Sequence, residues 1–455
     1  MNVDLRGRPG LGGKLLRVGL PLLLASSYTL ASDLLDVYRQ AQARDPAYRG
    51  AGHALKAARE RVPQARAGLL PTVNLTGANS RQTGQASFSE APYSDRDVRN
   101  RSWNLQLTQP LWRAASWAAL DQAEQQEALA EAQFRQTEQE LILRTAQAYL
   151  DVLVTREAER VARLQINAVE QQLGLAGRNF DVGTGTVTDV HEAQSRLDLA
   201  SAQAVAADSE LQNKQAELER ILGEPQSSLS RLREDSRLPG IEPAGVQPWL
   251  DSARDQSIQV RIAQATLDVA DREIAKSRAA HSPSLDLTAG YGNTFTSGSI
   301  TSPADISVRT RSTQVGLTLT IPLYAGGGVQ ARLREALALK DKAGEDLEAA
   351  RRQAVAQARQ AFTGVVNGGA QVTALASAVV SSRSSLDANK IGFRIGTRIN
   401  IDVLNAEQQL YAAQRDWHKA RADTLMQGLR LKAANATLAE ADLSAINDLL
   451  ETRQP

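Results

Sequence analysis

The sequence predicts an α+β membrane protein, internally duplicated, in which four long strands are continued by antiparallel helical hairpins. Three observations support this class. Segments recur in the same order at a nearly constant offset, four segments alternate apolar and polar residues, and two helical patterns run far longer than a globular domain needs. The 455 residues include no cysteine, so neither disulfides nor thiol chemistry contributes.

The duplication is visible as three matching pairs of segments. Two pairs are offset by 212 residues and the third by 213. The pairs are LLPTVNL (69–75) with HSPSLDL (281–287), LQLTQPLW (105–112) with LTLTIPLY (317–324), and NFDVGTGTVTDVHEAQSRL (179–197) with GFRIGTRINIDVLNAEQQL (392–410). The predicted parts are a signal peptide (1–31), a first structural repeat (32–240), a second structural repeat (241–438) and a C-terminal tail (439–455).

Each repeat predicts the same order of elements: a helix, two strands joined by a polar loop, a long helix, a glycine turn and a returning helix. No proline falls between Pro110 and Pro225, so nothing breaks the first long helix. Such a helix is about 100 Å long. The predicted helices are 33–67, 114–180 and a return to Leu222 in the first repeat, and 249–280, 329–393 and a return to Leu438 in the second.

The first 31 residues have the pattern of a secretory signal peptide. Basic residues precede an apolar run from Val18 to Ala25, which is far shorter than the roughly 20 residues of a membrane anchor, the alternative reading. Cleavage after Ala31 removes four positive charges and Asp4, a net +3, so the net charge changes from +1 to −2. This near-neutrality argues against a nucleic-acid partner. No later segment is expected to be an apolar helix of spanning length, which leaves a soluble exported protein or a β-barrel.

The strands alternate with period two. In the last strand Val315, Leu317 and Leu319 share one face, while Thr318 and Thr320 share the other. Such alternation is typical of outer-membrane barrels, although a half-buried sheet in a soluble sandwich produces it too. Four strands cannot close a membrane barrel, because the smallest such barrels have eight. We therefore expect several chains to share one barrel.

The ends of the strands carry their own signals. Pro110 and Pro322 are expected to end the strand ladders, and Trp112 and Tyr324 to lie at the membrane boundary as part of an aromatic belt. The polar loops between paired strands are expected to face outside the cell, at residues 84–98 and 297–307.

The duplicated strand–loop–strand segments that end in Pro-Leu-aromatic, and the paired turns DVGTGTVTDV and RIGTRINIDVLNAEQQLY, resemble the TolC family of outer-membrane channel proteins over essentially the whole mature chain. The resemblance implies a homotrimer with one twelve-stranded β-barrel, four strands per chain, continued by a periplasmic α-helical barrel of antiparallel hairpins. It implies a location in the bacterial outer membrane, in contact with its lipid and extending into the periplasm.

In function, the resemblance implies a passive exit duct of a tripartite export machine. Its partners are a periplasmic membrane-fusion adaptor protein and an inner-membrane ABC or proton-driven transporter. Because no cysteine is available for lipid modification, the chain resembles members used in type I protein secretion as well as in efflux of small molecules, and protein secretion is favoured. The alternative from another class is a trimeric coiled-coil surface adhesin without conductance, which predicts sustained heptads in one direction.

The resemblance also implies a gate at the turns between the long and returning helices. Asp402 matches an acidic position that forms a carboxylate ring in the closed tip and favours cations. The next ring position is Asn405 rather than an acid, which implies a weaker ring. Asp189 is the acid of the first repeat, but it has capping-box spacing from Thr186, and any first-turn acid is stabilised by the helix dipole.

Arg398 matches a family position that bridges to the neighbouring turn, near Thr188 and Asp189, and helps to hold the tip shut. The aromatic position that pairs with this acid in the family is Phe393 here, which has no hydroxyl to donate. The tip turns match segments that touch adaptor hairpins, although chain reversal alone also explains glycine there. These turn residues are Gly183, Thr184, Gly396 and Thr397.

Catalysis has little support in the sequence. The four histidines are scattered without metal-ligand spacing, and neither a phosphate loop nor a nucleophile elbow occurs. His191 and His418 are expected on helix surfaces. We therefore expect no enzymatic activity, no cofactor and no metal.

Overall fold

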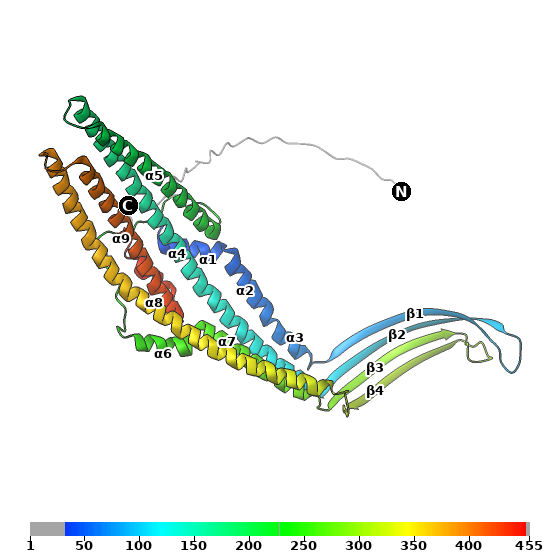
Figure 1. Cartoon of the computed structure of the whole chain (residues 1–455). Coiled ribbons are helices and arrows are strands. Elements are labelled where there is room, and N and C mark those ends of the chain that lie inside the picture. The colour runs from blue at the N-terminus through cyan, green and yellow to red at the C-terminus, as the bar shows by residue number, and fades with distance from the viewer. Residues whose placement is uncertain (1–31, 227, 452–455) are drawn as a thin grey trace, which may run out of the picture.

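The computed structural model describes residues 32–226 and 228–451, so the predicted signal peptide lies outside the described residues. The molecule is elongated, with a sheet at one end and helical hairpins at the other (Figure 1). Its elements are α1 (Leu34–Arg44), α2 (Pro46–Arg59), α3 (Arg61–Ala67), β1 (Thr72–Ala86), β2 (Ser94–Arg113), α4 (Ala114–Asp181), α5 (Val187–Leu222), α6 (Val246–Gln256), α7 (Ile258–Ala279), β3 (Ser284–Ser297), β4 (Val308–Thr320), α8 (Gly328–Arg394), α9 (Asn400–Ala434) and α10 (Glu440–Asn447).

The first predicted helix, 33–67, is divided into α1, α2 and α3. The break before α2 has a local cause: the Asp45 carboxylate accepts a hydrogen bond from Tyr48 N at 2.7 Å and caps the helix. Pro46 stands in the first turn, where its missing N–H leaves no intrahelical bond unmade. The prediction of one continuous helix was therefore wrong.

The second repeat shows the same kind of departure. The predicted helix 249–280 is divided at Ser257, whose hydroxyl caps the start of α7. The returning helix α9 ends at Ala434 rather than at Leu438, because the chain leaves the helical conformation at Ala436, whose φ is +56°. Both predicted bounds were wrong for the same reason: local capping and turn geometry override an apolar periodicity.

The long helices are confirmed. α4 has 68 residues and α8 has 67, which corresponds to about 100 Å each. Each reverses through a short turn into α5 or α9, so the chain forms two antiparallel hairpins that lie side by side (Figure 1). Buried alanines of α8, such as Ala354, Ala358 and Ala361, permit close packing of neighbouring helices.

α8 is also the only helix in the described ranges with a stretch long and apolar enough to cross a membrane, judged by length and composition alone. The mean hydropathy of that stretch is 1.2, and 6% of it is buried. The expectation that no later segment has this property was wrong. Residues 360–382 carry no charged side chain. A Cβ on Gly368 would lie 2.5 Å from the hydroxyl of Thr424, so part of this stretch packs tightly on α9.

The four strands form one antiparallel sheet in the order β1-β2-β3-β4. They have 15, 20, 14 and 13 residues, well beyond an average strand. Gly84 pairs with Arg96, so the first hairpin extends into the predicted loop 84–98, which was set too long. Both connecting loops lie at the end of the sheet far from the helices (Figure 1).

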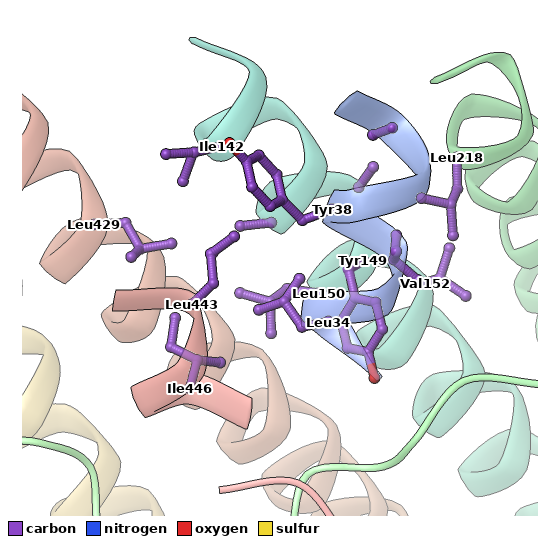
Figure 2. Close-up of a cluster of buried hydrophobic side chains, with 14 of the residues drawn as sticks. Leu34, Tyr38, Ile142, Tyr149, Leu150, Val152, Leu218, Leu429, Leu443 and Ile446 are labelled. Carbon is purple, nitrogen blue, oxygen red and sulfur yellow. The ribbon is translucent and has the colours of Figure 1, made fainter. Parts of the chain in front are cut away.

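The main core lies where α1, α4, α5, α9 and α10 meet (Figure 2). Tyr149 is fully buried there, and its hydroxyl donates to the carbonyl of Ser230 at 2.8 Å. Burial raises the pKa of this phenol above its ordinary value. Leu443 and Ile446 of α10 belong to the predicted tail, 439–455, and pack in this core, so that segment also contributes to the fold.

Candidate functional site: the strand segment and the hairpin tips

The sheet has one apolar face, and that face is exposed in the single chain. On β4, Val315, Leu317 and Leu319 are 71%, 65% and 61% exposed. The helices lie beyond one end of the sheet rather than over either face (Figure 1). A soluble sandwich requires a second sheet over the apolar face, and the described part of the chain forms only one sheet. The face therefore suits contact with lipid.

Pro110 does not end its strand ladder, contrary to the prediction. β2 continues to Arg113 through a register shift between Pro110 and Trp112. The bulge tolerates the missing N–H of proline and places Trp112 opposite Leu285, on the apolar face. Trp112 is 57% exposed there. Pro322 follows the end of β4, as predicted.

Two further aromatic residues lie farther from the helices, near the middle of β2 and β3. The rings of Trp103 and Tyr291 meet edge to face with their centroids 5.4 Å apart. Tyr291 pairs with Leu105, so this contact is on the apolar face. Tyr324, beyond β4, is 84% exposed. Sequence reasoning missed the Trp103–Tyr291 contact, because the alternation gives the face of each residue but not the register between β2 and β3.

Both hairpin tips are closed by the same turn. Gly183 in the α4–α5 turn and Gly396 in the α8–α9 turn have φ of +76° and +78°, in the left-handed region that glycine adopts without strain. The amides of Thr184 and Thr397 each donate to the carbonyl five residues earlier, at 2.8 Å and 2.9 Å. Thr188 is exposed in the first turn of α5.

The helix starts that follow the two turns differ. In α5 the predicted capping box is present: Asp189 N donates to Thr186 Oγ1 at 3.2 Å, and Thr186 N donates to the Asp189 carboxylate at 3.0 Å. Ile399 offers no side-chain acceptor at the same place. The Asp402 carboxylate accepts from Ile399 N at 3.4 Å and lies 3.8 Å from Arg398 Nη1. Asp189 is therefore engaged by its own cap more fully than Asp402.

Arg398 was expected near Thr188 and Asp189. In the described chain it forms an ion pair with Asp402 of its own turn, and no ion pair or side-chain hydrogen bond joins it to those two residues. Its side chain is 60% exposed. Phe393 is partly buried against the apolar cluster at the tip, which agrees with its lack of a polar group.

Asn405 links the two hairpins. Its side-chain oxygen accepts a hydrogen bond from Arg196 Nη2 at 3.1 Å, and Arg196 also donates to Gln408 at 2.9 Å. Nearby, Lys390 Nζ lies 2.9 Å from Glu407, whose side chain is 2% exposed. Sequence reasoning missed these contacts because helical spacing identifies neighbours within one helix, not across two.

The segment between the two hairpins is anchored by a buried cation. Arg421 is 1% exposed, donates to Ser236 Oγ at 2.6 Å and lies 4.7 Å above the Trp417 ring. His418, expected on a helix surface, is instead half-buried, and burial lowers its pKa. His191 is exposed, as expected. These groups hold α9 and the connecting segment together rather than forming a reactive centre.

An exposed apolar sheet face, open sheet edges and hairpins about 100 Å long define the class: a channel-forming outer-membrane protein with a periplasmic helical extension. The family described as "Outer membrane efflux protein" matches residues 37–224 and 249–437. The chain belongs to this family. It is an outer-membrane exit duct, and its hairpins extend into the periplasm.

Relatives and solved structures agree. The outer membrane protein TolC of Vibrio cholerae is 33% identical over 427 residues, covering 93% of this chain and 94% of the relative. The alkaline protease secretion protein AprF of Pseudomonas aeruginosa is 31% identical, covering 94% and 89%, and the proteases secretion protein PrtF of Dickeya chrysanthemi is 30% identical, covering 93% and 92%. The Campylobacter jejuni CmeC outer membrane channel shares the fold, with a TM-score of 0.76 at 16% identity, covering 92% of this chain and 90% of that one. The trimeric coiled-coil adhesin, the alternative class, predicts helices that run in one direction, and antiparallel hairpins joined to a sheet do not fit it.

Proposed function

We propose that three copies of this chain close one twelve-stranded barrel and continue it as a periplasmic tunnel. The observation that carries the proposal is the open sheet: β1 and β4 are its edges, and no strand in the described ranges pairs with their outer sides. Unpaired backbone groups are costly in lipid, so a neighbouring chain has to satisfy them. Two repeats, 32–240 and 241–438, each supply two strands and one hairpin.

Engineered disulfides test this closure, because the chain has no cysteine of its own. A cysteine at Val73 of β1, combined with single cysteines along β4 from Val315 to Leu319, is expected to give a covalent trimer at one register. The control pair replaces Leu105 and Tyr291, which are paired within one chain, and is expected to give only monomer. Monomer at every β1–β4 register contradicts the proposal.

The aromatic residues are proposed to mark the two membrane boundaries. Trp112 and Tyr324 lie at the helical end of the sheet, and Trp103 and Tyr291 lie farther along it, near the middle of β2 and β3. This spacing suits the two aromatic girdles of outer-membrane barrels.

The tip is proposed to gate the duct. Three copies of Asp402 form a carboxylate ring that favours cations, and the ring is weak because the next position, Asn405, is neutral and already bonded to Arg196. Arg398 holds the tip shut through contacts at the turn, and Thr188 and Asp189 lie on the facing turn. Asp402 suits the ring better than Asp189 does, because less of its carboxylate is engaged in a cap.

Planar-bilayer recordings test these roles separately. Asp402→Asn is expected to lower cation selectivity without loss of the trimer, since a first-turn acid contributes only about 0.3–1 kcal/mol to its helix. Arg398→Ser is expected to raise conductance by loosening the closed tip. Asp189→Asn is the matched control and should change selectivity less. If Asp402→Asn leaves selectivity unchanged and weakens the trimer, the carboxylate is only a cap.

The partners are proposed to be a periplasmic membrane-fusion adaptor protein and an inner-membrane ABC or proton-driven transporter. The adaptor contacts the exposed tip turns, at Gly183, Thr184, Gly396 and Thr397. Type I protein secretion is favoured, since two of the similar relatives are named for protease secretion. We assign no catalytic step to the chain. In a strain without its own duct, this chain should restore protease export; restored drug resistance without export points to small-molecule efflux instead.

A further inference from the structure

Five arginines gather on the apolar side of the sheet, at the strand ends far from the helices. The register places Leu75, Leu105 and Tyr291 opposite one another, so residues of odd number share this face in all four strands up to the β2 bulge. The same parity includes the set that we call the arginine belt: Arg81, Arg99, Arg101, Arg309 and Arg311.

The net charge of the strands is confined to that face. The acidic residues there are Asp95 and Asp97, so five arginines less two aspartates leave a net +3 per chain. On the opposite face, the charged residues of the four strands up to the bulge are Arg96 and Asp286, which cancel. A surplus of one sign on one face indicates a ligand of the opposite sign.

The belt begins where the apolar band ends. Arg311 pairs with Asn293, which also pairs with Trp103, so this arginine lies at the level of the Trp103 ring. From Trp112 to Trp103 is nine residues, or roughly 23 Å for a strand tilted by about 40°, close to the height of the apolar band of an outer-membrane barrel. Since the helices extend into the periplasm, the belt lies in the headgroup layer of the outer leaflet.

Part of the belt has no protein partner. Arg81 donates two hydrogen bonds of 2.8 Å to Asp97. The guanidinium carbon of Arg309 lies 5.6 Å from the centroid of the Phe295 ring. Within the described ranges, Arg101 and Arg311 make no ion pair or side-chain hydrogen bond, and all five arginines are exposed. An exposed guanidinium with free donors at a membrane surface matches the paired oxygens of a phosphate group.

We propose that the arginine belt binds the phosphate groups of anionic lipid headgroups in the outer leaflet and so holds a shell of phosphorylated lipid around the barrel. Arg101 and Arg311 are the principal contacts, because their donors are not used within the chain. The proposal depends on the location of the barrel in the outer membrane and not on the gate or on the exported substrate.

The test uses purified full-length protein and lipid A, the phosphorylated glycolipid, with native mass spectrometry to count retained lipid. Arg101→Gln/Arg311→Gln is expected to retain lipid A about thirty-fold more weakly than the unsubstituted protein. The matched control, Arg135→Gln/Arg220→Gln, removes the same charge from exposed helical positions and should leave retention unchanged. Arg101→Lys/Arg311→Lys keeps the charge without the forked donors and should be intermediate.

Two further arms identify the recognised group and its source. Dephosphorylated lipid A should bind as weakly to the unsubstituted protein as lipid A does to the glutamine variant, and inorganic phosphate at constant ionic strength should displace little lipid. Bilayer conductance of each variant confirms a closed barrel. The proposal is overturned if the glutamine variant retains lipid A normally, if the control loses it equally, if dephosphorylation has no effect, or if free phosphate displaces the lipid.

Discussion

The two hairpin tips adopt one backbone turn but fill it with different side chains. In the first tip, Asn179 carries a side chain and Gly185 does not, and a Cβ on Gly185 would lie 3.1 Å from Asn179 Cβ. In the second tip the arrangement is reversed: Gly392 faces Arg398, and a Cβ on Gly392 would lie 2.7 Å from Arg398 Cγ. The closed turn has room for one full side chain across it, and the two repeats place that side chain on opposite sides.

The hairpins also differ below the tips. The buried Glu407 pairs with Lys390 in the second hairpin, whereas the corresponding positions of the first are Gln194 and Gly177. The shared features, the turn and the antiparallel return, are backbone geometry. The features that differ are the bulk and the charge of the side chains, so the duplication preserved the shape of the hairpin while the chemistry of its tip diverged.

The largest expected effect comes from removing the cation of the buried pair. Lys390→Met leaves Glu407 buried without a partner, so the opening free energy of α9, measured by hydrogen exchange, should fall. The expected loss is about 3 kcal/mol, the low end for a broken buried pair, because Lys390 itself is partly solvated. Glu407→Gln added to this variant imports the residue of the first hairpin and should restore most of the protection. Equal exchange in the single and double variants means that the pair contributes nothing.

The steric arrangement of the second tip is tested by Gly392→Asn, which imports the first-tip residue opposite Arg398. The crowded contact should lower local protection of residues 391–400 by about 1–3 kcal/mol. The double variant Gly392→Asn/Arg398→Gly rebuilds the first-tip arrangement and should recover protection. A double variant as unprotected as the single one shows that the two tips are not sterically equivalent.

The core offers a smaller contrast between the repeats. Tyr149 corresponds to Phe362, and its hydroxyl satisfies the buried carbonyl of Ser230. Tyr149→Phe should reduce the protection of α4 by about 1 kcal/mol, as expected for one lost hydrogen bond. The reciprocal Phe362→Tyr should not increase protection. If Tyr149→Phe leaves the protection of α4 unchanged, the carbonyl of Ser230 finds another donor.

The smallest effect concerns pH. His418 corresponds to the exposed Val205, and burial lowers the pKa of its imidazole; Glu157 opposes this shift, whereas Arg421 and Arg160 add to it. Because the folded pKa lies below the ordinary value, the contribution of His418 to stability is complete above about pH 6.5 and is lost as the pH falls through the folded pKa.

His418→Gln removes this dependence. From about pH 7.5 to about pH 5.5 the thermal midpoint of the variant should fall less than that of the unsubstituted protein. Val205→Gln is the control at the corresponding position and should leave the pH profile unchanged. Parallel profiles for His418→Gln and the unsubstituted protein show that another group titrates.

Part of the tip could be predicted from sequence. Thr186 and Asp189 were predicted as a capping box because that contact spans three residues of one helix start, and the structure contains it. The burial of Glu407 against Lys390 could not be predicted in this way. It depends on how closely α8 and α9 approach each other, and side-chain periodicity does not encode that distance. The ion pair between Arg398 and Asp402 is local, four residues apart in one turn, and was missed because the family resemblance placed the partner of Arg398 in the other turn.

The sequence by itself determined the duplication, the amphipathic strands, the two long hairpins and the glycine turns, because each is a periodicity or a conformational preference within a short segment. Only the tertiary structure decided that Trp112 returns to the apolar face after the bulge, that Trp103 meets Tyr291, and that Asn405 bonds to Arg196. The physical reason is that strand register and the spacing between helices are set by all the packed elements together. A one-residue change in register moves every side chain of a strand to the other face.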